Sequence, residues 1–177
     1  FELRIEQKNG PILVKRNGVT ELTLIPGRQV ATAEGIEILC LTLDADIDDR
    51  LPAETVVEHI IAQGGVPVLS WAPGKWWFRR GRLVRRLIDT MQAQDLFLGD
   101  TALRPVGWPQ PVLIQRGLRR GLGLLAGTDP LPLAGEEQRL GQYGLFWEGP
   151  WNSAEPVAAL KNLLKNHKQE LRLAGRR

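Results

Sequence analysis

Between residues 52 and 127 the sequence alternates short apolar runs with longer amphipathic segments, and this alternation constrains the fold more than any other feature. Each apolar run has the length of a strand and is bounded by glycine, proline or polar residues, whereas apolar residues in the longer segments recur at helical spacing. The pattern predicts helices within 52–63, 81–94 and 109–120, and strands at 66–70, 95–99 and 122–126. Strands that alternate with helices pair in parallel through right-handed crossovers, in an open sheet or a barrel. The sequence therefore predicts an α/β fold.

The segment before residue 44 is predicted to form strands. Asn17-Gly18 lies between two β-rich arms at 11–16 and 19–25, and this dipeptide tolerates the positive φ angles of a tight hairpin turn. A further strand is expected at 36–43, and an acidic loop at 44–49. Towards the end of the chain we expect a loop at 135–150, a helix capped by Ser153 and a basic tail. Because no linker or internal repeat interrupts this order, residues 1–177 are expected to form one domain.

Composition narrows the class of protein. Hydrophobic residues make up 43% of the chain and charged residues 24%, which is ordinary for a globular domain. No apolar run approaches the roughly 20 residues that span a bilayer, so no membrane partner is expected. The single cysteine, Cys40, excludes an internal disulfide and favours a buried thiol in a cytoplasmic protein. His59 and His167 are too few for a histidine-rich metal centre. Because the chain begins at Phe1, further residues are expected upstream.

Asp129 is the most conspicuous candidate functional residue. The apolar run at 122–126 stops abruptly at Gly127-Thr128-Asp129-Pro130, which predicts a buried strand that delivers one carboxylate to its end. In α/β proteins, ligands bind in the loops just beyond the carboxyl ends of such strands. The alternative is that Asp129 only stabilises the following turn, since aspartate before proline is common turn chemistry. The residues alone leave both interpretations open.

The order of these segments resembles the later two-thirds of a PHP domain, the polymerase and histidinol phosphatase superfamily of metal-dependent phosphoesterases. The resemblance is carried by Leu24-Ile25-Pro26-Gly27-Arg28-Gln29-Val30, Glu34-Gly35-Ile36-Glu37-Ile38-Leu39, Ile60-Ile61-Ala62-Gln63-Gly64-Gly65-Val66-Pro67-Val68 and Leu125-Ala126-Gly127-Thr128-Asp129. It implies a partial or distorted (β/α)7 barrel whose strand ends hold zinc, manganese or iron ions. Those ions activate water against a phosphate ester. The domain's opening strand, which carries paired histidines, has no counterpart in the sequence.

The positions that would hold metal depart from the superfamily's pattern. Gln29 stands in place of a bridging glutamate, Trp71 in place of a histidine before proline, and Leu131 in place of a histidine after Asp129. The resemblance therefore implies that Asp129 alone would hold a divalent metal or orient water, with metal reduced or absent and hydrolysis weak or lost. Gln29, Trp71, Lys75 and Asp129 are expected to share one rim, which would bind a phosphate-containing small molecule.

A basic aromatic segment, residues 75–86, supports an alternative function. It contains Lys75-Trp76-Trp77-Phe78-Arg79-Arg80 and continues with Arg82, Arg85 and Arg86. Aromatic rings beside guanidinium groups stack on bases or sugars while the cations neutralise phosphates. The alternative is a non-catalytic module that binds an anionic ligand or a protein partner through Lys75, Trp76, Arg79 and Arg80, with nucleic acid a less favoured ligand. The other interpretation is that the tryptophans pack the helix against the fold while the arginines form a solvated face, and we favour it for Arg82, Arg85 and Arg86.

Assembly is a third hypothesis. A barrel that lacks its opening strands exposes backbone edges, and pairing between copies would form a homo-oligomer.

Overall fold

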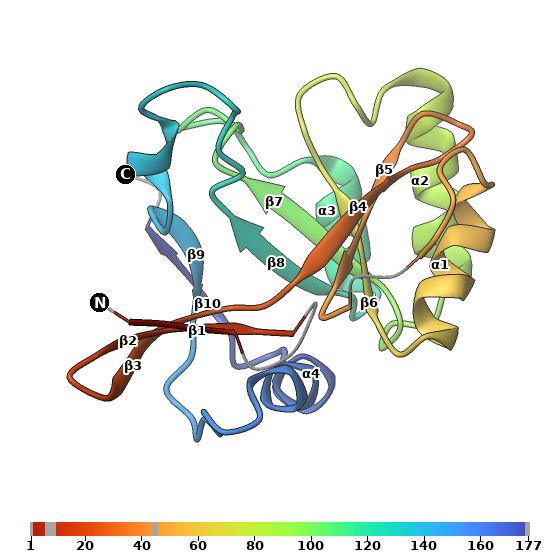
Figure 1. The fold of residues 1–177 in the computed structure, drawn as a ribbon. Coiled ribbons are helices and arrows are strands. Elements are labelled where there is room, and N and C mark those ends of the chain that lie inside the picture. Colours follow the sequence, from red (N-terminus) through yellow and green to blue (C-terminus); the bar gives the residue numbers. More distant parts are fainter. Residues whose placement is uncertain (1, 6–9, 44–45, 176–177) are drawn as a thin grey trace.

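A mixed five-stranded sheet forms the centre of the structure (Figure 1). The computed structural model describes residues 2–5, 10–43 and 46–175. The sheet order is β4-β5-β6-β7-β8, with β4 (Gly27–Ala31), β5 (Glu37–Leu41), β6 (Val66–Ser70), β7 (Phe97–Thr101) and β8 (Gly123–Gly127). β5 pairs antiparallel with β4 and β6, whereas β6, β7 and β8 are parallel. The carboxyl ends of β6, β7 and β8 therefore lie along one edge of the sheet, as the sequence pattern predicts.

Three helices cover one face of this sheet. They are α1 (Ala53–Ala62), α2 (Phe78–Thr90) and α3 (Val112–Arg119), and each connects two successive strands. Their apolar stripes pack on the sheet residues that point to the same side, including Ile38, Leu69 and Leu98, and form the main core. Asp89 of α2 and Arg116 of α3 also form an ion pair at 2.7 Å. In the described part of the chain, no helix is both long and apolar enough to cross a membrane.

The opposite face of the sheet is only partly covered. Helix α4 (Pro156–Asn166) packs Leu164 against Val68 and Phe97 and forms a second, smaller core. Beside β8, strand β9 (Tyr143–Phe146) pairs antiparallel with β10 (Arg172–Gly175). Figure 1 shows α4 below the sheet and this two-stranded ribbon at the side away from α1 and α2. The carboxyl half of the face is therefore left for the site described below.

The N-terminal hairpin is confirmed. β2 (Ile12–Arg16) and β3 (Val19–Leu24) pair antiparallel, and β1 (Glu2–Ile5) adds a third strand beside β2. Asn17 and Gly18 connect the arms with φ angles of 51° and 81°. Positive φ at both central residues is the geometry that asparagine and glycine permit in a tight turn.

The predicted (β/α)7 barrel is wrong. The sheet is open, and its edge strands β4 and β8 are not paired with each other in the described residues. A parallel strand needs a crossover of a dozen or more residues, usually a helix. The connections from β6 to β7 and from β7 to β8 contain such helices, and these strands pair in parallel. By contrast, β4 reaches β5 through a short turn and pairs antiparallel with it. The fold is a mixed α/β arrangement with two small additional sheets.

Several elements also differ from the sequence prediction. β4 was not expected, and β9 and β10 lie in segments predicted as loop and tail. Helix α2 begins at Phe78 rather than near residue 81, and α4 begins after Glu155, so Ser153 does not cap it. The acidic loop at 44–49 lies partly outside the described residues. Strand pairing accounts for the missed strands, because a short segment of four or five residues gains its stability from a neighbouring strand rather than from its own pattern.

Candidate ligand site at the ends of the parallel strands

A cavity of about 240 Å³ lies on the sheet face that α4 leaves uncovered. Because side chains alternate along a strand, the residues on this face are those that point away from α1, α2 and α3. Leu39, Val68 and Leu125 supply an apolar floor from three strands. The remaining lining residues are Leu41, Ser70, Gly99, Asp100, Thr101, Ala126, Gly127 and Asp129. We call this cavity the strand-end pocket.

The mouth of the strand-end pocket is polar. Ser70, Thr101 and Asp129 stand at or just beyond the ends of β6, β7 and β8. The Thr101 hydroxyl accepts a hydrogen bond from the Leu103 amide at 3.3 Å. Asp129 is exposed and its φ is 49°, a conformation that aspartate adopts more readily than most residues. Its carboxylate makes no hydrogen bond or ion pair with the rest of the described chain, so it remains available to a ligand.

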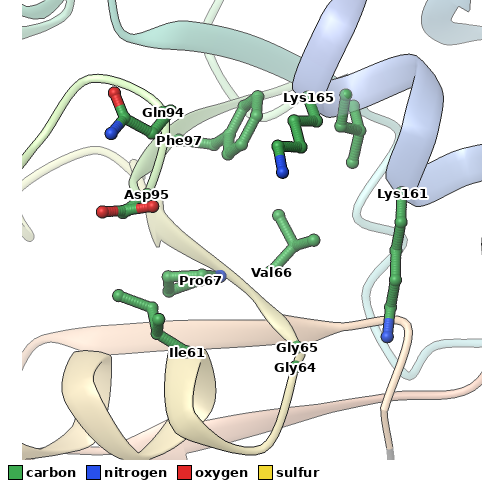
Figure 2. Close-up of a pocket in the computed structure, with 11 residues that line it drawn as sticks. Ile61, Gly64, Gly65, Val66, Pro67, Gln94, Asp95, Phe97, Lys161 and Lys165 are labelled. Carbon is green, nitrogen blue, oxygen red and sulfur yellow. The ribbon is translucent and has the colours of Figure 1, made fainter.

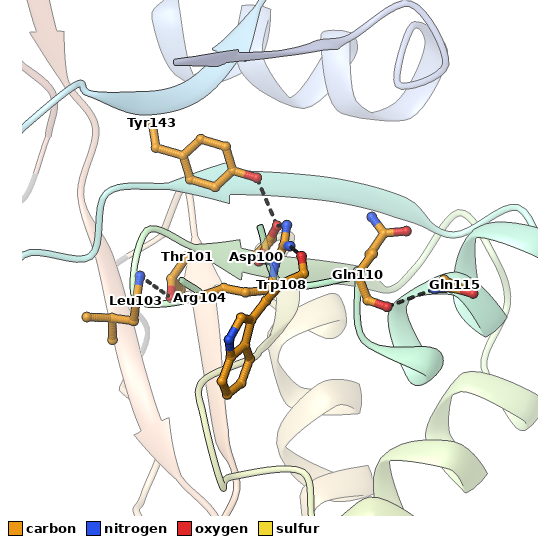
Figure 3. Close-up of polar contacts among 8 residues, drawn as sticks. All are labelled: Asp100, Thr101, Leu103, Arg104, Trp108, Gln110, Gln115 and Tyr143. Carbon is orange, nitrogen blue, oxygen red and sulfur yellow. Dashed lines mark hydrogen bonds and ion pairs between the residues drawn. The ribbon is translucent and has the colours of Figure 1, made fainter. Parts of the chain in front are cut away.

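A second aspartate at this edge is fully engaged (Figure 3). Asp100, at the end of β7, is 1% exposed, and both carboxylate oxygens face the Arg104 guanidinium. Arg104 Nε donates to Oδ1 at 2.9 Å and Nη2 to Oδ2 at 2.5 Å. The Tyr143 hydroxyl donates to Oδ2 at 2.8 Å, and Arg104 Nη1 donates to the Trp108 carbonyl at 2.8 Å. The hydrogen bonds and charge of Asp100 raise the pKa of Arg104 above its ordinary value. The network joins β7, the following loop and β9.

Sequence analysis missed the role of Asp100. A signal was present, because Gly99-Asp100-Thr101 ends an apolar strand much as Gly127-Thr128-Asp129 does. Arg104 follows Asp100 by four residues, but that spacing indicates a contact only if the intervening turn brings the two side chains together. Here the turn does so, with the Arg104 amide donating to the Thr101 carbonyl at 3.1 Å.

The residues expected to share one rim are dispersed. Gln29 is exposed on β4, on the same sheet face as Leu39, while Asp129 follows β8. β4 and β8 are the two edge strands of the sheet. They are separated by four interstrand spacings of about 4.8 Å each. Trp71 is buried in the main core on the opposite face. Only Asp129 of this group lines the strand-end pocket.

Some residues of the basic aromatic segment are buried or paired within the fold, and others are exposed. Trp76 is buried, and its Nε1 donates to the Ser70 carbonyl at 3.1 Å. Lys75 pairs with Glu37 at the start of β5. Arg80 Nη2 donates to the Gly74 carbonyl at 3.1 Å and helps to hold the loop before α2, whereas Arg79 is exposed.

Two aromatic residues between these positions face solvent. Trp77 is 59% exposed and Phe78 is 85% exposed. Phe78 also has a φ of 53°, which is unusual for a bulky residue.

A multinuclear metal centre does not fit the donors at this edge. Asp129 contributes one carboxylate, whereas the Asp100 oxygens are bound by Arg104 and Tyr143. Among the residues that the structure describes, no three histidine, cysteine or acidic side chains gather closely enough to hold an ion. A divalent metal needs several such ligands to offset its dehydration. Binding of one metal ion by Asp129 stays a prediction.

The comparisons with known proteins add no family. No protein-family model matches this sequence, and no curated protein is significantly similar to it. The resemblance to PHP domains therefore remains a hypothesis that rests on the segments quoted above.

Proposed function

We propose that this protein binds a small molecule in the strand-end pocket and is weakly active or inactive as a phosphoesterase. The observation that carries the proposal is the contrast between two carboxylates at one sheet edge. Asp100 is neutralised by a buried arginine, whereas the Asp129 carboxylate stands at the mouth of an apolar cavity with no partner among the described residues. A concave apolar surface with a few polar groups at its mouth is the usual form of a ligand site.

The lining favours a particular ligand chemistry. The floor accepts an apolar body, and Asp129 accepts a hydrogen bond from an ammonium, amidinium or amide group. None of the described lining residues is a lysine or arginine, so a phosphate group would meet hydroxyls and backbone amides but no cation, and the Asp129 carboxylate would repel it. We therefore favour an amine-bearing small molecule over a phosphate ester. A cytoplasmic location, in keeping with the buried free thiol of Cys40, is part of the proposal.

Three probes of one shape test this chemistry. Benzylamine, benzyl alcohol and benzoate share a ring but differ in charge, and binding is followed by the amide chemical shifts of Leu125 and Gly127. We expect benzylamine to bind with an affinity about tenfold higher than benzyl alcohol, since hydrogen bonds to charged groups contribute about 1.5–3 kcal/mol. Equal affinity for all three probes would refute the role of the carboxylate.

Two substitutions locate the probe. Asp129→Asn removes the charge, and we expect it to abolish the preference for benzylamine, whereas Asp48→Asn removes an exposed carboxylate elsewhere and serves as the control. Gly127→Leu places a side chain on the same face as Leu125, where a Cβ meets no atom within 4 Å. This variant is expected to fill the pocket and prevent binding without loss of stability.

Hydrolysis is tested in the same variants. Turnover of p-nitrophenyl phosphate with added manganese or zinc is expected to stay near background and to be unchanged in Asp129→Asn. Metal-dependent turnover that Asp129→Asn eliminates would contradict the proposal and establish a working phosphoesterase site.

The start of α2 supports a second candidate function, the binding of an anionic partner. Trp77 and Phe78 present exposed rings at the start of the helix on which Arg79 and Arg82 are also exposed. Exposed aromatics beside arginines stack on bases while the charges contact phosphates. Lys75 and Trp76, by contrast, are engaged within the fold.

A short oligothymidylate and heparin distinguish base stacking from charge alone. If the surface binds nucleic acid, Trp77→Ala weakens binding of the oligonucleotide but not of heparin. Arg79→Gln should lower the slope of log K against log salt by about 0.7 for the single strand. Binding of neither polyanion at low salt would remove this candidate.

A further inference from the structure

A second cavity, of about 280 Å³, lies at the amino ends of β6 and β7 (Figure 2), whereas the strand-end pocket lies at the carboxyl ends of the parallel strands. It is bounded by α4 and by the turns that precede β6 and β7. Its volume is slightly below that of typical ligand cavities, which run from about 300 Å³ upwards, so it suits only a small molecule. We call it the amino-end cavity.

The amino-end cavity has an apolar floor. Val66 and Pro67 come from β6, Phe97 from β7 and Leu164 from α4. Gly64 and Gly65 form the adjoining turn, where Gly64 has a φ of 75° that favours glycine. The absence of side chains at this turn leaves room for Lys161 of α4. The Lys161 Nζ lies 3.7 Å from the position that a Cβ of Gly64 would take.

Positive charge is concentrated on one wall of the amino-end cavity. Lys161 and Lys165 lie one turn apart on α4 and both line it. Figure 2 shows Lys165 reaching over Val66, with its Nζ toward the open space, and Lys161 running down the wall toward Gly64 and Gly65. Neither ammonium group has a hydrogen-bond or ion-pair partner within the described chain. Asp95 lies on the opposite wall.

We propose that the amino-end cavity binds a small organic anion with an apolar body. The anionic group lies between the ammonium groups of Lys161 and Lys165, and the apolar part rests on Val66, Pro67 and Phe97. Asp95 sets the orientation of the ligand, because its carboxylate repels an anion and so favours the orientation in which the anionic head group contacts α4. The strand-end pocket has the opposite charge preference, so this site does not rest on the proposed function.

The test uses octanoate, octylamine and 1-octanol, which share an alkyl chain. Binding is measured from the amide shifts of Gly64, Gly65 and Phe97, which differ from the amides that report on the strand-end pocket. We expect saturable binding of octanoate below about 10 mM, and affinities at least tenfold lower for octanol and octylamine. The inference is overturned if octanol binds as tightly as octanoate, or if octanoate shifts none of these amides.

Charge variants separate specific binding from adsorption to the apolar floor. Lys165→Gln and Lys161→Gln are each expected to raise the dissociation constant of octanoate about tenfold. Arg50→Gln, which removes one exposed positive charge from the loop before α1, is the control and should leave it unchanged. Asp95→Asn should tighten octanoate binding a few-fold. An unchanged dissociation constant in both lysine variants would also overturn the inference.

Discussion

Removal of the Asp100 carboxylate is the most direct test of the network that holds the carboxyl edge of the sheet. Asp100 is 1% exposed and Arg104 is 7% exposed, and the two groups make two parallel N–H···O bonds. In Asp100→Ala the Arg104 guanidinium would remain in the same buried place without the Asp100 carboxylate. Breaking a buried pair in this way costs about 3–5 kcal/mol, because the remaining charge stays desolvated. This is a large share of the roughly 5–15 kcal/mol by which domains are stable.

Two further variants resolve the contributions within the network. Tyr143→Phe removes one hydrogen bond to the carboxylate and should cost about 1.5–3 kcal/mol. The double variant Asp100→Leu with Arg104→Met removes both charges and keeps apolar volume. Its loss in free energy of unfolding should be smaller than the summed losses of Asp100→Leu alone and Arg104→Met alone by about 2 kcal/mol or more, because no buried charge of this pair remains.

The assay is urea unfolding followed by tryptophan fluorescence, with the free energy of unfolding obtained by linear extrapolation. Two of the 6 tryptophans, Trp71 and Trp76, lie in the main core, so the signal reports global unfolding. A loss below about 1 kcal/mol in Asp100→Ala would show that solvent reaches Arg104 and would refute the reasoning. Additive losses in the double variant would show that the two side chains are not coupled.

Three other outcomes follow from local geometry. Gly123→Ala should lower stability by about 1–3 kcal/mol, because its Cβ would overlap the Phe97 ring, whereas Gly144→Ala, with open space at Cβ, should be neutral in the same urea titration. Phe78→Gly should be more stable than Phe78→Ala by about 0.5–1 kcal/mol, since both remove the exposed ring but only glycine relieves the positive φ; equal midpoints would contradict this. Burial lowers the pKa of Lys168 below 10.5, an effect that Asp95 partly opposes, so the unfolded state binds the proton more tightly. The stability of the wild type relative to Lys168→Met should therefore rise with pH towards 10.5, and a constant difference between pH 7 and 10 would be inconsistent with the burial.

Local patterns predicted the elements that carry their own signal. Asn17-Gly18 requires a turn that few other dipeptides permit, and the structure has the hairpin there. The apolar stripe of α1 and the parallel order of β6, β7 and β8 were also predicted, because helical periodicity and crossover length are properties of continuous segments.

Closure of the sheet could not be predicted in the same way. Whether an edge strand finds a partner depends on residues far away in the sequence, and no local pattern specifies which distant segment will pair with it. Strand β4 shows the difficulty: its five residues pair with β5 in antiparallel register, which a short turn allows and a parallel (β/α)7 barrel would not. The assignment of Gln29 and Asp129 to one rim depended on closure and therefore did not survive an open sheet.

The site raises a related problem, because the sequence supplies two strand-end aspartates that look alike. Asp100 and Asp129 each follow a buried strand, yet one is enclosed by a guanidinium and a phenol while the other stands at the mouth of a cavity. The difference arises from Arg104 and Tyr143, which reach Asp100 through a loop and through β9. A carboxylate whose charge is already balanced holds elements together, whereas one at the mouth of an apolar cavity without a partner in the described chain gains most from a ligand's donor. Our proposal that Asp129 rather than Asp100 contacts a ligand thus depends on where Arg104 lies, which is a property of the folded chain.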